Sequence, residues 1–412
     1  MSLFDMVALL LSLAALFSLI NYKTIKLPNG IGIMLIGLLM SIALIISNKI
    51  GLFSTASIQN IFSQIDFNDA VLNGMLSFLL FAGALHVNIN RLAELADTIA
   101  ILATIGVAIS AGIVSIVAFY IFNGLGIEIS YIYCLLFGVL ISPTDPIAVM
   151  GILKKIGAPK SIEVKITGES LFNDGIAVVF FIVVLEIATG QQEVSFSHIS
   201  LLFIKEALGG AIYGFIIGYI AYLLLKTVDD YQVEVLITLA LVTGGYSLAQ
   251  HLHISGPIAI VIAGLMIGNH GRKLAMSENT RKRLDDFWEL IDEILNALLF
   301  LLIGVELLII QISQNYVLAS LLIIPTVLIA RFISVGLPVA LLKFKNSYSP
   351  HAIKILTWGG LRGGISVALA LSIPPGQWRD PLLTATYGVV IFSILVQGLT
   401  IGKVAAMANK SK

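Results

Sequence analysis

Charged residues are scarce in this sequence. Only 12% of its 412 residues are Asp, Glu, Lys or Arg, whereas an average soluble domain has about 25%, and 58% of the residues are hydrophobic. A water-soluble fold has no way to bury so much apolar surface, so the soluble classes of protein are excluded. We therefore expect a protein that resides in a membrane.

Cysteine is almost absent. Cys134, the single one, lies in an apolar run, which excludes an internal disulfide and a cysteine-based metal cluster, and we interpret it as a packing residue. The first apolar stretch, residues 6–20, lacks the basic flank and the small-residue cleavage site of a signal peptide, so we expect a first membrane span there. Since Ser/Pro-rich linkers and a soluble regulatory tail are missing too, residues 1–412 are predicted to form one membrane domain.

Long apolar runs dominate instead. Residues 31–46, 99–122 and 320–342 approach or exceed the roughly 20 residues that a helix needs to cross the hydrocarbon core. Turn and charge clusters predict about thirteen helical spans, an all-α polytopic membrane protein. The spans begin near residues 6, 29, 69, 99, 131, 163, 200, 233, 256, 294, 316, 351 and 382.

Basic residues favour one side of these predicted spans. With the N-terminus outside, 19 of the 24 basic residues fall in cytoplasmic segments and only Lys49 and Arg379 in outer loops, as the positive-inside rule demands for an inner-membrane protein. The cytoplasmic residues are Lys23, Lys26, Arg91, Lys154, Lys155, Lys160, Lys165, Lys226, Arg272, Lys273, Arg281, Lys282, Arg283, Lys343, Lys345, Lys354, Lys403, Lys410 and Lys412. The C-terminus is therefore expected in the cytoplasm.

Residues 278–293 alternate charged and apolar side chains, which predicts an amphipathic helix along the cytoplasmic interface. A solvated helix that orders the next span and a pH-sensing segment are both compatible with this pattern.

Two predicted spans contain helix-breaking sequence at their centres. The fifth has Ser-Pro-Thr-Asp-Pro at residues 142–146, and the twelfth has Gly-Gly-Leu-Arg-Gly-Gly at residues 359–364. Exposed backbone at that depth is tolerated only where it lines a cavity or is buried in protein. Interrupted spans in both halves of such a chain indicate inverted repeats that cross around a midplane ion site. Charges coincide with the breaks, Asp145 in one and Arg362 in the other, and we expect Arg362 to balance the crossed helix ends.

The sixth predicted span carries several polar residues. Glu169 and Asn173 share one face of a helix, and Ser170 and Asp174 share the adjacent face. Ionisable groups inside a membrane are costly, about 2.5 to 3.5 kcal/mol on insertion scales, and mark functional sites. Sodium and lithium prefer oxygen ligands. The candidate ion-binding residues are Asp174, Asp145, Ser170, Thr144 and Asn173, of which the first four are the candidate metal ligands, and we expect no cofactor.

Three motifs together resemble the NhaP-type sodium/proton antiporters of the cation/proton antiporter-1 family. They are residues 144–146 (Thr-Asp-Pro), residues 168–175 (Gly-Glu-Ser-Leu-Phe-Asn-Asp-Gly) and residues 360–363 (Gly-Leu-Arg-Gly), and the resemblance covers essentially the whole chain in motif order. It implies antiport of sodium and protons at Asp174, with Asn173 typical of electroneutral members. It also implies a homodimer with mobile core helices and dimerisation helices. Many relatives carry an acidic residue in the third span, where this chain has Ala82 in the run 81–85.

Arg331 lies in the middle of a predicted span, where an unpaired guanidinium would be costly, so it requires a buried partner. Glu169 is the leading candidate, and the family resemblance implies the same pairing. We expect a structural charge pair that leaves Asp174 free to exchange. Cation and proton would then compete for Asp174 under alternating access.

Other functions remain to be weighed against antiport. The same oxygen ligands would serve potassium, and the sequence does not separate it from sodium or lithium. A channel would need a selectivity ring or pore loop, and none is visible. An intramembrane aspartyl or serine hydrolase could also use buried Asp or Ser residues, and Asp145 and Asp174 make the aspartyl version the stronger alternative. The proline-flanked break and the neighbouring Glu169 and Arg331 favour ion exchange. We predict no enzymatic activity and no nucleic-acid partner, only ions, the lipid bilayer and a second copy of the chain.

Overall fold

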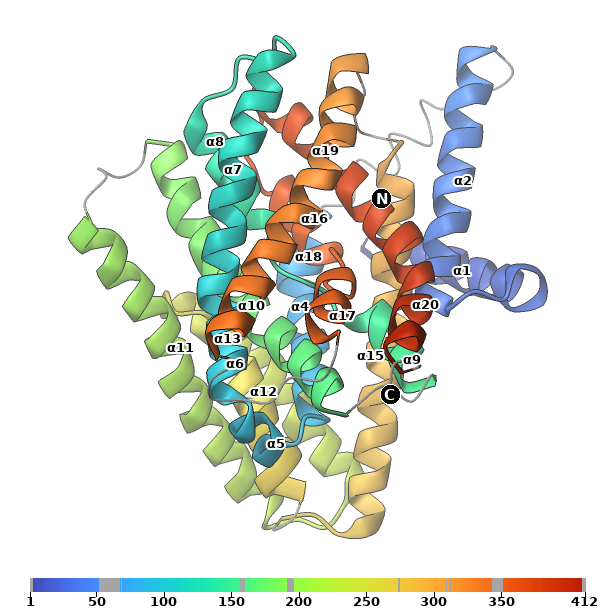
Figure 1. The fold of residues 1–412 in the computed structure, drawn as a ribbon. Helices are drawn as coiled ribbons and strands as arrows, with labels where there is room; N and C mark the ends of the chain where they lie inside the picture. Colours follow the sequence, from blue (N-terminus) through green and yellow to red (C-terminus); the bar gives the residue numbers. More distant parts are fainter. Residues whose placement is uncertain are drawn as a thin grey trace.

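The protein is a bundle of helices (Figure 1). The computed structural model describes residues 3–51, 67, 69–155, 160–190, 196–272, 275–308, 310, 313–342 and 351–409, and within them all regular secondary structure is helical. In chain order the elements are α1 (Leu3–Ile20), η1 (Asn21–Ile25), α2 (Asn29–Lys49), η2 (Asp69–Met75), α4 (Leu76–Leu85), α5 (Ile89–Glu94), α6 (Ala96–Ile101), η3 (Leu102–Gly106), α7 (Val107–Gly124), α8 (Tyr131–Leu140), α9 (Ile147–Lys155), α10 (Lys160–Ala188), α11 (Phe196–Leu225), α12 (Tyr231–His251), α13 (Gly256–Met266), η4 (Ile267–Gly271), α15 (Glu278–Glu306), α16 (Gln314–Leu342), α17 (Ala352–Trp358), α18 (Gly364–Leu371), α19 (Arg379–Phe392), η5 (Ser393–Gln397) and α20 (Gly398–Asn409). The η elements are π-helical turns.

Eight helical segments in the described residues are long and apolar enough to cross a membrane. They are Phe4–Ile25, Asn29–Asn48, Ala96–Gly124, Lys160–Ala188, Leu201–Leu225, Tyr231–His251, Gln314–Ala340 and Arg379–Ala406. Shorter apolar helices cover Ala70–Leu85, Tyr131–Leu140 and Gly256–Gly271. Helices suit this environment because they satisfy their own backbone hydrogen bonds where lipid offers none. The total of thirteen spans stays a prediction.

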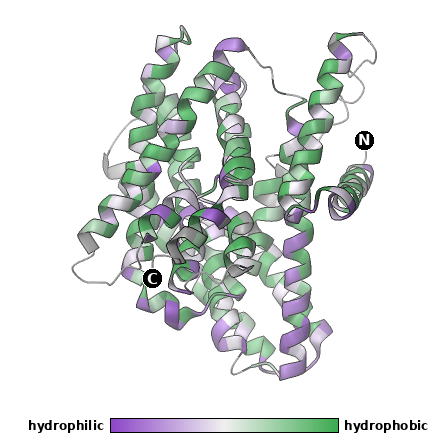
Figure 2. Cartoon of the chain, turned by 45° about the vertical axis from the view of Figure 1, so that its right-hand side comes forward, coloured by the Kyte–Doolittle hydropathy of each residue, from purple (hydrophilic) through white to green (hydrophobic). Residues whose placement is uncertain are grey.

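Apolar side chains cover much of the outer surface of the bundle. On α11, Leu201, Ile204 and Leu208 are more than half exposed and lie on one side of the helix. Figure 2 shows hydrophobic residues along most of the helical surface, with hydrophilic residues gathered mainly in the lower half of the view. An apolar exterior of this extent is typical of a surface that faces lipid.

The two helix-breaking sequences interrupt helices in the structure. α8 ends at Leu140 and α9 begins at Ile147, while α17 ends at Trp358 and α18 begins at Gly364. The two interruptions touch, because the backbone N–H of Asp145 donates a hydrogen bond of 2.8 Å to the carbonyl oxygen of Leu361. The two non-helical segments therefore lie against each other inside the bundle.

The segment from residue 278 differs from the expectation. The sequence predicts an interfacial amphipathic helix over residues 278–293 and a separate span from about residue 294. The structure instead has one continuous helix, α15, whose N-cap Ser277 accepts a 3.4 Å hydrogen bond from the backbone of Thr280. The run contains no glycine or proline before Gly304, so nothing interrupts the helix where the charged half meets the apolar half.

α10 and α15 hold the central positions for the site. α10 packs against α8, α11 and α13, and α15 packs against α2, α4 and α12. Trp288 anchors α15, since its side chain is fully buried, its ring centroid lies 4.6 Å from that of Phe81, and its Nε1 donates to Thr238 Oγ1 at 3.1 Å. These contacts fix one face of α15 against α4.

Candidate ion-binding site

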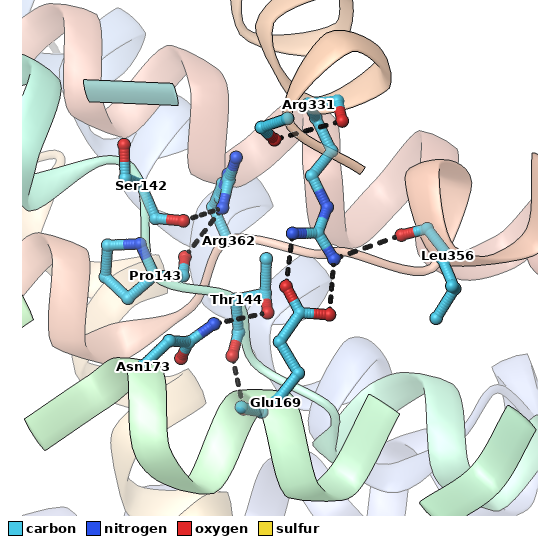
Figure 3. A network of polar contacts seen from close by, with 10 residues as sticks. Ser142, Pro143, Thr144, Glu169, Asn173, Arg331, Leu356 and Arg362 are labelled. Atoms are coloured by element: carbon cyan, nitrogen blue, oxygen red, sulfur yellow. Dashed lines mark hydrogen bonds and ion pairs between the residues drawn. The ribbon is translucent and has the colours of Figure 1, made fainter. Parts of the chain in front are cut away.

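Arg362 lies where the two interrupted helices cross. Its side chain is buried, and Nη1 donates hydrogen bonds to the carbonyl oxygens of Ser142 and Pro143, the second at 2.9 Å (Figure 3). The Ser142 carbonyl has no helical donor of its own, because the residue four positions later, Pro146, has no N–H. Arg362 thus satisfies backbone oxygens that the break exposes, at the negative end of the α8 dipole.

A glycine lets the two segments approach closely. A Cβ on Gly363 would collide with the carboxylate of Asp145, so a side chain at this position would push the crossing apart. Ser393 adds a second anchor, since its Oγ accepts a 2.9 Å hydrogen bond from the backbone N–H of Arg362. The position of Asp145 is therefore set by both interruptions.

α10 presents its polar residues to the first interruption. The hydroxyl of Ser170 donates to the carbonyl oxygen of Thr144, and Asn173 Nδ2 donates to Thr144 Oγ1 at 2.9 Å (Figure 3). Both α10 side chains are buried, and no hydrogen-bond partner is found for Asn173 Oδ1 among the described residues. These contacts hold α10 against the broken helix.

A cavity of about 580 Å³ lies between α4, the first interruption, α10 and α15. The ionisable or hydroxyl-bearing side chains on its wall belong to His86, Arg91, Asp145, Lys160, Glu163, Thr167, Ser170, Asp174 and Asp292. Of the five residues predicted to bind the ion, the structure brings Asp145, Ser170 and Asp174 to this wall. Thr144 and Asn173 are not on it, and they bond to each other behind it.

Asp174 is the most buried of the cavity's aspartates, with 7% of its surface exposed. It lies one helical turn after Ser170, on the same face of α10, and close enough to Asp145 for the two carboxylates to repel each other. An ionised carboxylate that is so deeply buried is costly unless a proton or a cation neutralises it. The cavity supplies access for both.

Glu169 and Arg331 form a separate, closed charge pair on the other side of α10. Arg331 Nη2 donates to Glu169 Oε2 at 2.9 Å and to the carbonyl oxygen of Leu356 at 3.2 Å, and Nη1 bonds the second carboxylate oxygen (Figure 3). The glutamate is 1% exposed and the arginine 5%. A Cβ on Gly360 would lie 2.5 Å from Arg331 Nε, so the guanidinium packs directly on the second interruption. The pair joins α10, α16 and α17 and does not line the cavity.

Asp292 also lies on the cavity wall, although the pattern of residues 278–293 predicts it on the charged face of an interfacial helix. A weak signal exists in the spacing, because Asp292 and Asn296 are one turn apart where α15 becomes apolar.

The described residues contain no group of three or more His, Cys, Asp or Glu side chains arranged to hold a resident metal ion. Carboxylate, hydroxyl and carbonyl oxygens do converge at the cavity, and such oxygens suit a hard cation in transit. Broken helices that cross beside a buried carboxylate are typical of secondary transporters.

The chain belongs to the sodium/hydrogen exchanger family of transmembrane proteins, whose family model matches residues 10–406. It is 49% identical over 403 residues to the Na⁺/H⁺ antiporter NhaP of Pseudomonas aeruginosa, covering 97% of this chain and 95% of that one. It is 33% identical over 402 residues to the Na⁺/H⁺ antiporter NhaH of Halobacillus dabanensis, covering 96% of both. The structure of the sodium/proton antiporter MjNhaP1 from Methanocaldococcus jannaschii matches with a TM-score of 0.78 at 21% identity, over 98% of this chain and 99% of that one, so the two share a fold. The chain is thus a multi-pass membrane protein of an antiporter family.

Proposed function

We propose that this chain exchanges sodium or lithium for protons across the cell inner membrane, by competition of cation and proton for Asp174. The observation that carries the proposal is the placement of Asp174, buried on α10 but on the wall of a cavity that also presents Asp145 and Ser170. The names of the relatives, which are Na⁺/H⁺ antiporters, support the choice of ions.

Coupling follows from the electrostatics of one carboxylate. The bare anion is costly in a low-dielectric core, whereas the protonated and the sodium-bound forms are nearly neutral. Only the two loaded forms then exchange between outward-facing and inward-facing states, and no separate coupling device is needed. Asp174 carries the ion, while Asp145 and Ser170 complete its oxygen shell.

One cation leaves per proton that enters, and the cycle is electroneutral. Support comes from Asn173, which precedes Asp174 in the chain and stays neutral while its amide bonds Thr144. Thr144 and Asn173 influence ion binding indirectly, because their hydrogen bond holds α10 against the first interruption, which carries Asp145.

The N-terminus lies outside and the C-terminus in the cytoplasm, as the bias of basic residues indicates. The cavity wall includes Arg91 and Lys160, two of the residues assigned to the cytoplasmic side, which supports an opening toward the cytoplasm.

The membrane domain has thirteen spans in two inverted repeats, whose broken members are α8–α9 and α17–α18. Mobile core helices carry the site past dimerisation helices in a homodimer. The two interruptions and the fold shared with MjNhaP1 support the broken-helix architecture, and the family resemblance of the sequence motifs supports the mobile core and the homodimer.

The test is cation-dependent proton movement in proteoliposomes that contain a pH-sensitive dye. Addition of sodium or lithium to the purified protein is expected to move protons, and Asp174→Asn is expected to remove the signal. A native protein that responds to potassium alone would replace the proposed substrate with potassium. A native protein that responds to no alkali cation would contradict antiport.

A further inference from the structure

Asp292 of α15 is a carboxylate that the proposed exchange does not yet use. It lies on the wall of the same cavity as Asp145 and Asp174, and it is near enough to Asp145 for the two negative charges to interact. Within the described part of the chain no Lys or Arg forms an ion pair with Asp292. The negative charge of Asp292 is therefore available to interact with a cation in the cavity.

Packing fixes the direction of this side chain. Trp288 lies one helical turn before Asp292 and is clamped between Phe81 and Thr238, so this face of α15 cannot rotate. Further along the helix, Leu299 also lines the cavity and fills the space beside Gly364, where any Cβ would collide with it. Asp292 is held between these two anchors.

Asn296, one turn after Asp292, supports the carboxylate. It is 6% exposed, its side chain lies within reach of the carboxyl group of Asp292, and its Oδ1 is buried with no hydrogen-bond partner among the described residues. A buried amide oxygen without a partner is uncommon in a folded protein, so the surroundings of this carboxylate are not fully satisfied by the described residues.

The wall that α4 forms beside α15 lacks such a group. α4 contributes Leu76, Leu79, Leu80, Ala82 and Gly83 to the cavity, and none of them carries a ligand oxygen on its side chain. Ala82 and Gly83 are small, so they leave room in front of the third-span wall. Asp292 therefore supplies from α15 a ligand oxygen that the side chains of the α4 wall do not offer.

We propose that Asp292 is a further cation-binding residue of this cavity, which takes the incoming sodium ion from water and presents it to Asp145 and Asp174. Asn296 positions it. This inference rests on the proposed antiport function. Clefts lined by negative charge raise the local concentration of cations, so Asp292 acts on the apparent affinity for sodium more than on the maximal rate.

The experiment compares Asp292→Asn with Glu293→Gln in proteoliposomes at constant ionic strength, with choline replacing sodium. Glu293 is the next residue on α15, is exposed, and loses the same charge without touching the cavity. Asp292→Asn is expected to raise the sodium concentration at half-maximal rate by about tenfold, with the maximal rate little changed. Glu293→Gln is expected to behave as the native protein. An equal half-saturation in the two variants would overturn the role of Asp292.

Relocation of the charge gives a second, independent test. Ala82→Asp places a carboxylate in the same cavity from α4 and is expected to lower the half-saturation of Asp292→Asn toward the native value. If Asp292→Asn does not fold, Ala82→Asp in the native background is expected to lower the half-saturation below the native value, and an unchanged value would overturn the inference. Absence of sodium-driven flux in the native protein would instead contradict the proposed function itself.

Discussion

α10 carries two buried carboxylates in two different electrostatic surroundings. Glu169 faces Arg331 in a closed pair, 1% exposed and bonded through both oxygens. Asp174, little more than one turn later, faces a cavity and shares it with Asp145. One membrane helix can therefore carry a carboxylate with a permanent countercharge on one side and, on the other side, a carboxylate that the transported ion neutralises.

Substitution of Asp174, on the cavity side of α10, is expected to have the largest effect on transport. Asp174→Asn is expected to reduce sodium-driven proton flux to the level of protein-free liposomes, because an amide neither takes up and releases a proton nor carries a negative charge that a sodium ion would neutralise. The fold is expected to survive, since the change removes a buried charge. The flux assay measures this directly, with Asp286→Asn on the exposed face of α15 as the matched control. Native flux from the Asp174 variant would show that the ion binds elsewhere.

Substitutions in the Glu169–Arg331 pair are expected to affect the stability of the protein rather than its ion selectivity. Glu169→Gln leaves the Arg331 guanidinium buried without a countercharge, and breaking such pairs typically costs about 3 to 5 kcal/mol. Thermal unfolding in detergent measures the loss, with Glu289→Gln on the exposed face as the control. The double variant Glu169→Gln/Arg331→Gln is expected to recover part of the stability. Strictly additive losses would mean that the two residues are not coupled.

Arg362 tests whether a buried charge near both the Glu169–Arg331 pair and the cavity contributes to stability or to ion binding. Arg362→Gln removes charge-assisted hydrogen bonds to the carbonyl oxygens of Ser142 and Pro143, each worth about 1.5 to 3 kcal/mol. We expect destabilisation of that order, with sodium half-saturation little changed in the protein that remains folded. The exposed Arg281→Gln serves as the control. A stable variant with a greatly altered half-saturation would place Arg362 in the ion's shell.

Ser170 gives the smallest expected effect. Its hydroxyl is engaged with the Thr144 carbonyl while it also lines the cavity, so Ser170→Ala removes one neutral oxygen and one neutral hydrogen bond. A net change of about 1 kcal/mol corresponds to a roughly fivefold weaker apparent sodium affinity. Exposed Ser247→Ala is the matched control in the same flux assay. Complete loss of transport in Ser170→Ala would contradict this expectation and show that the hydroxyl is as necessary for transport as the carboxylate of Asp174.

The sequence predicts the residues of this comparison better than their surroundings. Proline chemistry alone predicts the break before Asp145, and the cost of a buried guanidinium alone requires a partner for Arg331. The sequence does not show which side chains face the cavity, because helical periodicity defines the faces of a helix but not what lies opposite each face. The sequence therefore does not predict that Thr144 and Asn173 bond to each other instead of lining the cavity. It also does not predict that Asp292 reaches the cavity, because its segment has the charge pattern of an interfacial helix.

The most direct test of the account is the sodium concentration at half-maximal proton flux, measured in proteoliposomes between about pH 5 and 9, a window that brackets carboxylates shifted by burial. Competition for Asp174 predicts that this concentration rises as the pH falls, while the maximal rate at saturating sodium changes much less. A valinomycin-set potential is expected to have little effect, because one charge replaces one charge. A half-saturation that does not depend on pH would contradict competition at a single carboxylate.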